Sequence, residues 1–212
     1  FMQDVVILSA KRTPIGKFLG ALSSVAAPRL GAAALSAAAS AAGADLADYQ
    51  QVLMGNVLQA GQGQAPARQA AIYAGLPKSV GAVTLHKVCG SGLRTVMDAA
   101  NGIRAGEWDL LLAGGMENMS QSPHLLERSR GGYRMGEVKV ADSMIKDGLW
   151  DPYGDKHMGN CAELCAGKYE FTRESQDAFA LASYQRAQAA IEAGQFDPEI
   201  ASVAVPQRKG DP

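Results

Sequence analysis

The chain has 212 residues, 47% of them hydrophobic and 19% charged, with a formal net charge of −1. Such a composition is typical of a globular protein with a buried core, and a near-neutral charge with only 6% aromatic residues excludes a nucleic-acid-binding surface of basic stripes and stacking rings. No apolar run is long enough to span a membrane and no signal peptide is recognisable, so we expect no membrane contact. Three cysteines without disulfide-like spacing predict a cytoplasmic location.

Apolar runs and helix-like segments alternate over residues 4–113. We expect strands at residues 4–9, 52–57, 81–88 and 108–113, and helices at residues 28–42, 66–74 and 91–105. Gly43 is expected to end the first helix, and Gly114 with Gly115 the fourth strand. The third helix has one apolar face, formed by Leu93, Val96, Met97 and Ala100. The alternation predicts an α/β fold with a largely parallel sheet.

The regular pattern stops after Ser120. Residues 121–153 are polar and glycine-rich, and so long a stretch without periodic elements usually has a function or belongs to an insertion. Helices are expected again at residues 158–169 and after an N-cap at Thr172, the latter ending before Gly194. The buried face of this last helix is expected to consist of Phe179, Ala180, Ser183 and Ala187. A short strand is expected at residues 200–205.

Cys89 ends the third predicted strand, and Gly90 and Gly92 lead from it into a predicted helix. The free N–H groups and the dipole of a helix start favour an anion, and therefore the thiolate form of a cysteine there. The same N–H groups could stabilise the oxyanion of an acyl group attached to the sulfur. The position thus indicates acyl transfer through a thioester. The alternative is a buried, inert cysteine.

Two other kinds of site receive weaker support. Gly90 and Gly92 suggest a dinucleotide-binding loop, but the third glycine of that motif is replaced by Thr95. His157, Cys161 and Cys165 recur every fourth residue and could suggest a metal site. On a helix the first and last would lie roughly 12 Å apart along the axis, too far for one zinc ion. We therefore expect no metal site, and expect Cys161 and Cys165 to be packing residues.

Three motifs in order resemble the thiolase family, and within it the acetoacetyl-CoA (biosynthetic) type. They are KVCGSG at residues 87–92, AGGMENMS at residues 113–120, and HMG at residues 157–159. The opening SAKRTPIG at residues 9–16 is also similar, so the resemblance covers essentially the whole chain. One departure is His86, a position at which this family often has Asn.

The resemblance implies a thiolase-like layered α/β half-domain with an inserted loop domain. Residues 1–119 would form the N-terminal α/β domain that carries the nucleophile. Residues 120–212 would form a loop domain, incomplete here, that covers coenzyme A and carries the oligomerisation segment. A homo-oligomer, a dimer of dimers, is expected. A complementary C-terminal half would supply an activating His, a second Cys and an Asn-based oxyanion hole, so we expect this chain alone to be inactive.

The implied reaction is the reversible Claisen condensation of two acetyl-CoA molecules to acetoacetyl-CoA through S-acetyl-Cys89, with the Cys89 backbone N–H in the oxyanion hole. Coenzyme A takes part as a substrate, and no covalently bound cofactor is expected. Leu149, His157 and Met158 match positions that line the pantetheine and acyl pocket, and the bulky His-Met pair favours a short acyl chain. The alternatives are a 3-ketoacyl-CoA thiolase of fatty-acid breakdown and, in another class, a non-catalytic CoA-binding or oligomerisation remnant.

Overall fold

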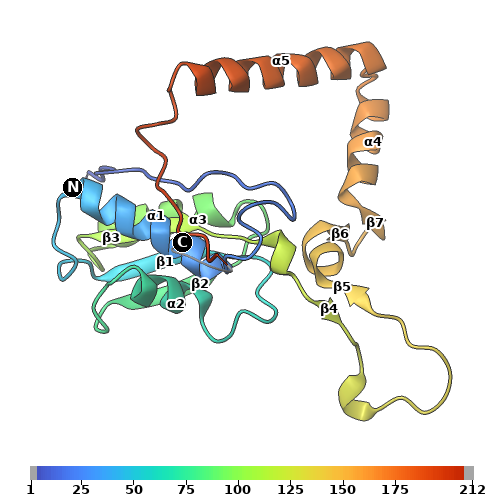
Figure 1. Ribbon diagram of the computed structural model, residues 1–212, viewed down its shortest axis with the longest axis horizontal. Helices are drawn as coiled ribbons and strands as arrows, with labels where there is room; N and C mark the ends of the chain where they lie inside the picture. The colour runs from blue at the N-terminus through green and yellow to red at the C-terminus, as the bar shows by residue number, and fades with distance from the viewer. Residues whose placement is uncertain (1–3, 208–212) are drawn as a thin grey trace. The chain divides into compact units, whose positions relative to one another are not determined.

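The computed structural model describes residues 4–207, which form two compact units (Figure 1). The first unit comprises Phe1–Gly148 and Ala201–Pro212 as far as they are described, and the second comprises Leu149–Ile200. The unit boundary thus follows Gly148, within the segment for which the sequence predicts an insertion. The division into functional domains at residues 119 and 120 stays a prediction.

The first unit contains a parallel three-stranded sheet flanked by helices, which confirms the predicted α/β class. Its main elements are α1 (Ala27–Ala42), β1 (Gln51–Gly55), α2 (Pro66–Tyr73), β2 (Gly81–Leu85), α3 (Ser91–Ala105) and β3 (Leu111–Gly115). The strand order is β2-β1-β3, and both ladders are parallel. Their carboxyl ends therefore lie at one edge of the sheet, where α/β proteins commonly bind ligands.

Helices α1 and α2 pack against each other and bury one face of the sheet. Pro28 lies in the first turn of α1, and the helix ends at Gly43 in the left-handed conformation (φ 69°), as predicted. On β1, Val52 and Met54 are fully buried in this core. Since strand side chains alternate, the intervening Leu53 and the following Gly55 belong to the opposite face.

Helix α3 lies on that opposite face and approaches β1 and β3 through small residues. A Cβ on Gly55 would lie 2.6 Å from Ser91 Cβ, and one on Gly115 would lie 3.2 Å from Gly92 Cα. The hydroxyl of the fully buried Thr95 donates to the Gly92 carbonyl at 2.7 Å and to the Gly114 carbonyl at 2.9 Å. The close approach holds the start of α3 over the carboxyl ends of the two strands.

This packing corrects one prediction and shows which face of α3 is buried. The fourth strand does not stop before Gly114 and Gly115: β3 includes both glycines and ends at Gly115, where the absence of a side chain lets α3 approach. The apolar face of α3 is not its buried face: the buried residues are small ones, Ser91, Thr95, Ala99 and Gly102. Leu93 is 70% exposed and Met97 50% exposed, because no described element packs over that side of the helix.

The predicted strands at residues 4–9 and 200–205 are wrong. Neither segment belongs to a ladder in the described part of the chain, and Val6 and Ile7 are largely exposed. A strand needs a hydrogen-bonded partner, and apolar character alone does not supply one. The Ala201 amide donates to the Arg12 carbonyl at 2.7 Å, so the later segment contacts the chain at a residue beyond the predicted strand 4–9.

Between β3 and the second unit the chain forms only short elements, as the polar composition predicts. They are η1 (Met119–Gln121), β4 (His124–Leu125), η2 (Ser129–Gly131), β5 (Ala141–Asp142) and a π-helical turn η3 (Met144–Leu149). Strands β4 and β5 pair antiparallel. The second unit then contains β6 (Trp150–Asp151), β7 (Lys156–His157), α4 (Met158–Lys168) and α5 (Arg173–Glu192).

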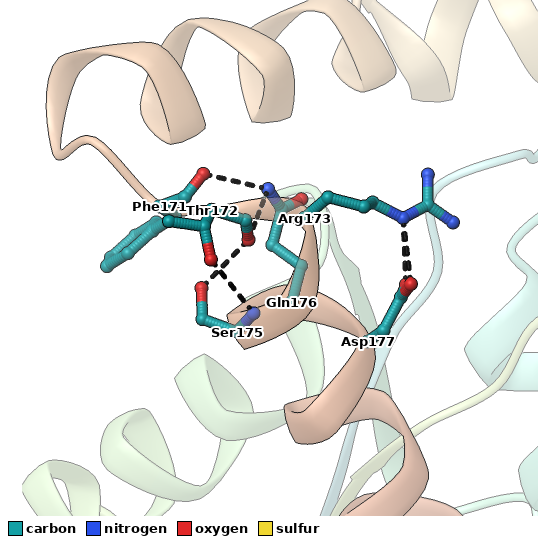
Figure 2. Close-up of polar contacts among 6 residues, drawn as sticks. All are labelled: Phe171, Thr172, Arg173, Ser175, Gln176 and Asp177. Carbon is teal, nitrogen blue, oxygen red and sulfur yellow. Dashed lines mark hydrogen bonds and ion pairs between the residues drawn. The ribbon is translucent and has the colours of Figure 1, made fainter.

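Helix α5 begins as predicted, at a Thr172 N-cap (Figure 2). The Thr172 hydroxyl accepts from the Ser175 amide at 3.2 Å, and the Ser175 hydroxyl donates to the Thr172 carbonyl at 2.8 Å. Arg173 pairs with Asp177 one turn on, at 2.9 Å. These local bonds define the helix start. The predicted buried face is wrong: Phe179, Ala180, Ser183 and Ala187 are all exposed, because no element of the second unit packs along α5.

Candidate active site

Cys89 lies at the carboxyl edge of the sheet, in the turn that joins β2 to α3. Its side chain is exposed, which excludes the buried, inert cysteine considered as the alternative. Gly90 is the N-cap of α3, so Cys89 immediately precedes the helix start. A thiol at this position is accessible to a substrate and lies within the field of the helix N-terminus.

The turn is held by Ser91, the first residue of α3. The Ser91 hydroxyl accepts from the Lys87 amide at 2.8 Å and donates to the Val88 carbonyl at 2.6 Å. The side chain is almost fully buried against Gly55. Sequence reasoning assigned no role to Ser91; the signal was a small hydroxyl residue at the first helical position, next to glycines that permit close packing.

Two of the amides at the helix start are already paired within this turn. The Gly90 amide donates to the Lys87 carbonyl and the Ser91 amide to the Val88 carbonyl, both at 3.1 Å. These two amides therefore stabilise the turn and are not available to a bound anion. They are excluded from the donors that the helix start was expected to offer to the oxyanion. The oxyanion role assigned to the Cys89 N–H stays a prediction.

The residue before the cysteine is conformationally strained. Val88 has φ of 47°, in the left-handed region that a β-branched residue rarely adopts. The Val88 amide donates to Nδ1 of His86 at 3.1 Å, which fixes the peptide that precedes the strained residue. Val88 is thus held on both sides, by His86 and by Ser91, and Cys89 takes its position from this constraint.

Glu117 joins the carboxyl ends of β1 and β3. Its carboxylate accepts from the Asn56 side chain and the Val57 amide, both at 2.9 Å, and from the Leu58 amide at 3.3 Å. Burial raises the pKa of Glu117 above its usual 4.5, although the two amides, His86 and Asn56 oppose that rise. The sequence motif at residues 113–120 contained this residue, but nothing in its pattern indicated the partners.

Replacing Glu117 with Gln should change how stability depends on pH. A carboxyl with a raised folded-state pKa binds more protons in the native than in the unfolded protein between the two pKa values. The stability of the wild type relative to Glu117→Gln should therefore fall as pH rises from about 4.5. At neutral pH the variant should still lose about 1–3 kcal/mol, because its amide group can accept from only part of the donor set.

Denaturant unfolding between about pH 4 and pH 8 would measure this difference. Glu107→Gln, which removes the same charge from an exposed carboxylate, is the matched control and should show no such trend. A difference between wild type and Glu117→Gln that does not change with pH would contradict the assignment.

Leu149, His157 and Met158 lie close together at the start of the second unit. Strands β6 and β7 pair Trp150 with His157, so Leu149, next to Trp150, is a neighbour of the His-Met pair. The His157 Nδ1 accepts from the Gly159 amide at 3.0 Å and thereby caps α4, whose first residue is Met158. Met158 is 41% exposed. Cys89 belongs to the other unit, so a joint pocket stays a prediction.

The structure offers no group of metal ligands in residues 4–207: nowhere do three His, Cys, Asp or Glu side chains gather. Cys161 is half-buried and Cys165 exposed, so the prediction that both are packing residues is wrong for Cys165. Among the described helices, none is both long and apolar enough to cross a membrane.

Comparison with known proteins identifies the family. The family described as "Thiolase, N-terminal domain" matches residues 5–212. The chain belongs to the thiolase family. The resemblance on three short motifs is thereby confirmed over almost the entire chain.

The relatives of this thiolase chain cover it from end to end. Acetyl-CoA acetyltransferases are 56% identical over 211 residues in Cupriavidus necator and 54% identical over 211 residues in Pseudomonas aeruginosa. That of Allochromatium vinosum is 51% identical over 210 residues. The matches cover 100%, 100% and 99% of this chain and 54%, 54% and 53% of those relatives. The thiolase chain thus spans about half the length of the curated relatives it matches.

Proposed function

We propose that the protein to which this chain belongs is an acetyl-CoA C-acetyltransferase that forms and cleaves acetoacetyl-CoA. One observation carries the proposal: the exposed Cys89 on a rigid turn, in a chain 51–56% identical to proteins named acetyl-CoA acetyltransferase. A nucleophile that forms an acyl-enzyme needs an accessible sulfur in a fixed position. The turn held by Ser91 and His86 supports both requirements.

In the first half of the reaction the Cys89 thiolate attacks the carbonyl carbon of acetyl-CoA. A carbon–sulfur bond to Cys89 forms, and the bond to the CoA sulfur breaks, so that CoA leaves as a thiolate and takes up a proton. In the second half a base removes a proton from the methyl group of another acetyl-CoA. The resulting carbanion attacks the acetyl group on Cys89, which releases acetoacetyl-CoA and regenerates the Cys89 thiolate.

The chemistry requires groups beyond this chain. Its relatives are about twice as long, and we propose that a complementary C-terminal half provides the base, the residue that activates Cys89 and the remaining oxyanion donors. The exposed apolar face of α3, with Leu93 and Met97, supports contact with a further part of the protein. We further propose a homotetramer built as a dimer of dimers, and a cytoplasmic location, which the three free cysteines support.

Leu149, His157 and Met158 are proposed to line the pantetheine and acyl pocket. Replacing Met158 with Ala should widen the pocket and raise kcat/KM for longer 3-ketoacyl-CoA substrates relative to acetoacetyl-CoA by roughly 10-fold, in line with the 1–3 kcal/mol attributed to methylene-sized changes in apolar pockets. Thiolysis rates over a series of chain lengths measure the ratio. Met135→Ala, at a fully exposed methionine, is the control. An unchanged ratio would remove Met158 from the pocket.

Thiolysis of acetoacetyl-CoA by the intact protein tests the function itself. We expect CoA-dependent cleavage to two acetyl-CoA molecules, with much lower kcat/KM for longer 3-ketoacyl-CoA esters. A preference for the longer esters would instead indicate a thiolase of fatty-acid breakdown. Binding of CoA without turnover would indicate a non-catalytic module.

A further inference from the structure

Two imidazoles in this chain form the same local contact, with different consequences. In both, Nδ1 accepts from the amide two residues further on: His86 from Val88 at 3.1 Å, and His157 from Gly159 at 3.0 Å. His157 caps a helix in which the following residues have ordinary geometry. At His86 the donor belongs to the strained Val88, the residue immediately before the proposed nucleophile.

We propose that His86 is a pH-sensitive positioning residue for Cys89, because its neutral imidazole holds the Val88 amide and keeps the strained turn in the conformation that presents the sulfur. The inference rests on the proposed function, since it concerns the regulation of the same site. His86 does not itself touch a substrate. It acts through the peptide of Val88.

The chemistry of the imidazole makes the contact conditional on protonation. Accepting a hydrogen bond requires the lone pair of Nδ1, so the neutral ring must carry its proton on Nε2. Protonation of Nδ1 converts that acceptor into a donor, which then faces the Val88 N–H, another donor. The contact is lost, and the φ of 47° at Val88 loses one of its two supports. The other support is the hydrogen bond from the Ser91 hydroxyl to the Val88 carbonyl, and a serine hydroxyl does not ionise near neutral pH.

The charges around His86 favour such a switch. At the carboxyl end of β3, Glu117 interacts electrostatically with His86. On its own turn the titratable neighbours are Lys87 and Cys89. The loop after β1 contributes uncharged residues, and the first turn of α3 contributes Arg94, which pairs with Asp98 at 2.7 Å. The Glu117 carboxylate attracts the imidazolium, which gives the protonated ring an interaction to replace the one it loses.

The rate of Cys89 alkylation by iodoacetamide, followed on the Cys89 peptide by mass spectrometry in the intact protein, tests the inference. Only the thiolate reacts, so thiol titration alone makes the logarithm of the rate rise with pH at a slope of one. For the wild type we expect a slope steeper than one in the acidic part of the profile, where the imidazole becomes protonated. His86→Asn should keep a slope of one, because its amide oxygen can accept from Val88 without titrating.

His86→Ala should react more slowly than His86→Asn at every pH, by roughly three- to tenfold, the factor that corresponds to one hydrogen bond. His124→Asn replaces an exposed histidine of β4, outside the Cys89 turn, and should retain the wild-type profile. A wild-type slope of one would overturn the proposal. So would a wild-type rate that rises as His86 protonates, since that would indicate activation of the thiolate by the positive charge instead of positioning.

Acetylation of Cys89 by acetyl-CoA in the same samples separates this inference from the proposed function. Acetylation with a slope of one supports the function and overturns the role of His86. A steep slope without acetylation supports the role of His86 and contradicts the function.

Discussion

Replacing Cys89 with Ala should abolish transfer of the acetyl group from acetyl-CoA to the protein and lower thiolysis by at least roughly 10³-fold. Removal of a covalent nucleophile leaves only the contributions of binding and of the oxyanion donors. The structure places the sulfur, exposed, where the chain passes from β2 into α3, so its loss should not disturb the core. Radiolabelled acetyl-CoA, acid quench and peptide mass spectrometry would locate and quantify the label.

The chain supplies two matched controls, Cys161→Ala and Cys165→Ala, which remove the same group from α4. Both should retain the acetyl label on Cys89 and most of the thiolysis rate. Acetyl transfer to another residue, at the wild-type rate, in Cys89→Ala would remove Cys89 from the mechanism. Equal losses in all three variants would show that the substitutions act on stability and not on chemistry.

Replacing Gly55 with Ala should displace the Cys89 turn although residue 55 is in a different strand. The new Cβ would lie 2.6 Å from Ser91 Cβ, 2.7 Å from the Ser91 carbonyl carbon and 2.8 Å from the Gly92 nitrogen. Two of these atoms are backbone, so no side-chain rotation can relieve the overlap. We expect a loss of about 1–3 kcal/mol in the free energy of unfolding and an alkylation rate at Cys89 lowered by roughly tenfold or more, because a 1 Å misplacement costs comparable factors.

Denaturant unfolding and iodoacetamide alkylation measure the two effects separately. Gly131→Ala is the control in the same unit, because a Cβ there meets nothing within 4 Å. It should change neither quantity. An alkylation rate of Cys89 in Gly55→Ala equal to that of the wild type would contradict this prediction. It would show that α3 can shift away from β1 without moving the cysteine.

Elements with strong local signals could be predicted from the sequence. Helix α1 has Pro28 in its first turn and Gly43 just after its end, and α5 has Thr172 as N-cap; these signals work through the local backbone and need no partner. Strands were less certain, because an apolar run such as residues 4–9 becomes a strand only where another strand is available to pair with it.

The two glycines at the end of β3 illustrate the opposite error. The sequence predicts that Gly114 and Gly115 terminate the strand, yet both are part of β3. Gly115 leaves room for Gly92 of α3 to approach the strand. For the same reason α3 buries its small residues and leaves Leu93 exposed. A local sequence pattern indicates which kind of element forms, but not how closely a neighbouring element packs against it.

The candidate site, too, was predictable from the sequence only in part. The sequence by itself identified the proposed nucleophile, Cys89, because a strand, a cysteine and two glycines before a helix are consecutive in the chain, and it determined the family through motifs that are also consecutive. Only the tertiary structure decided how Cys89 is supported: Glu117 joins β3 to the loop after β1, and Gly55 makes room for Ser91. Those contacts connect residues that lie tens of positions apart, and their geometry is set by the packing of the sheet and of α3, which no local pattern records.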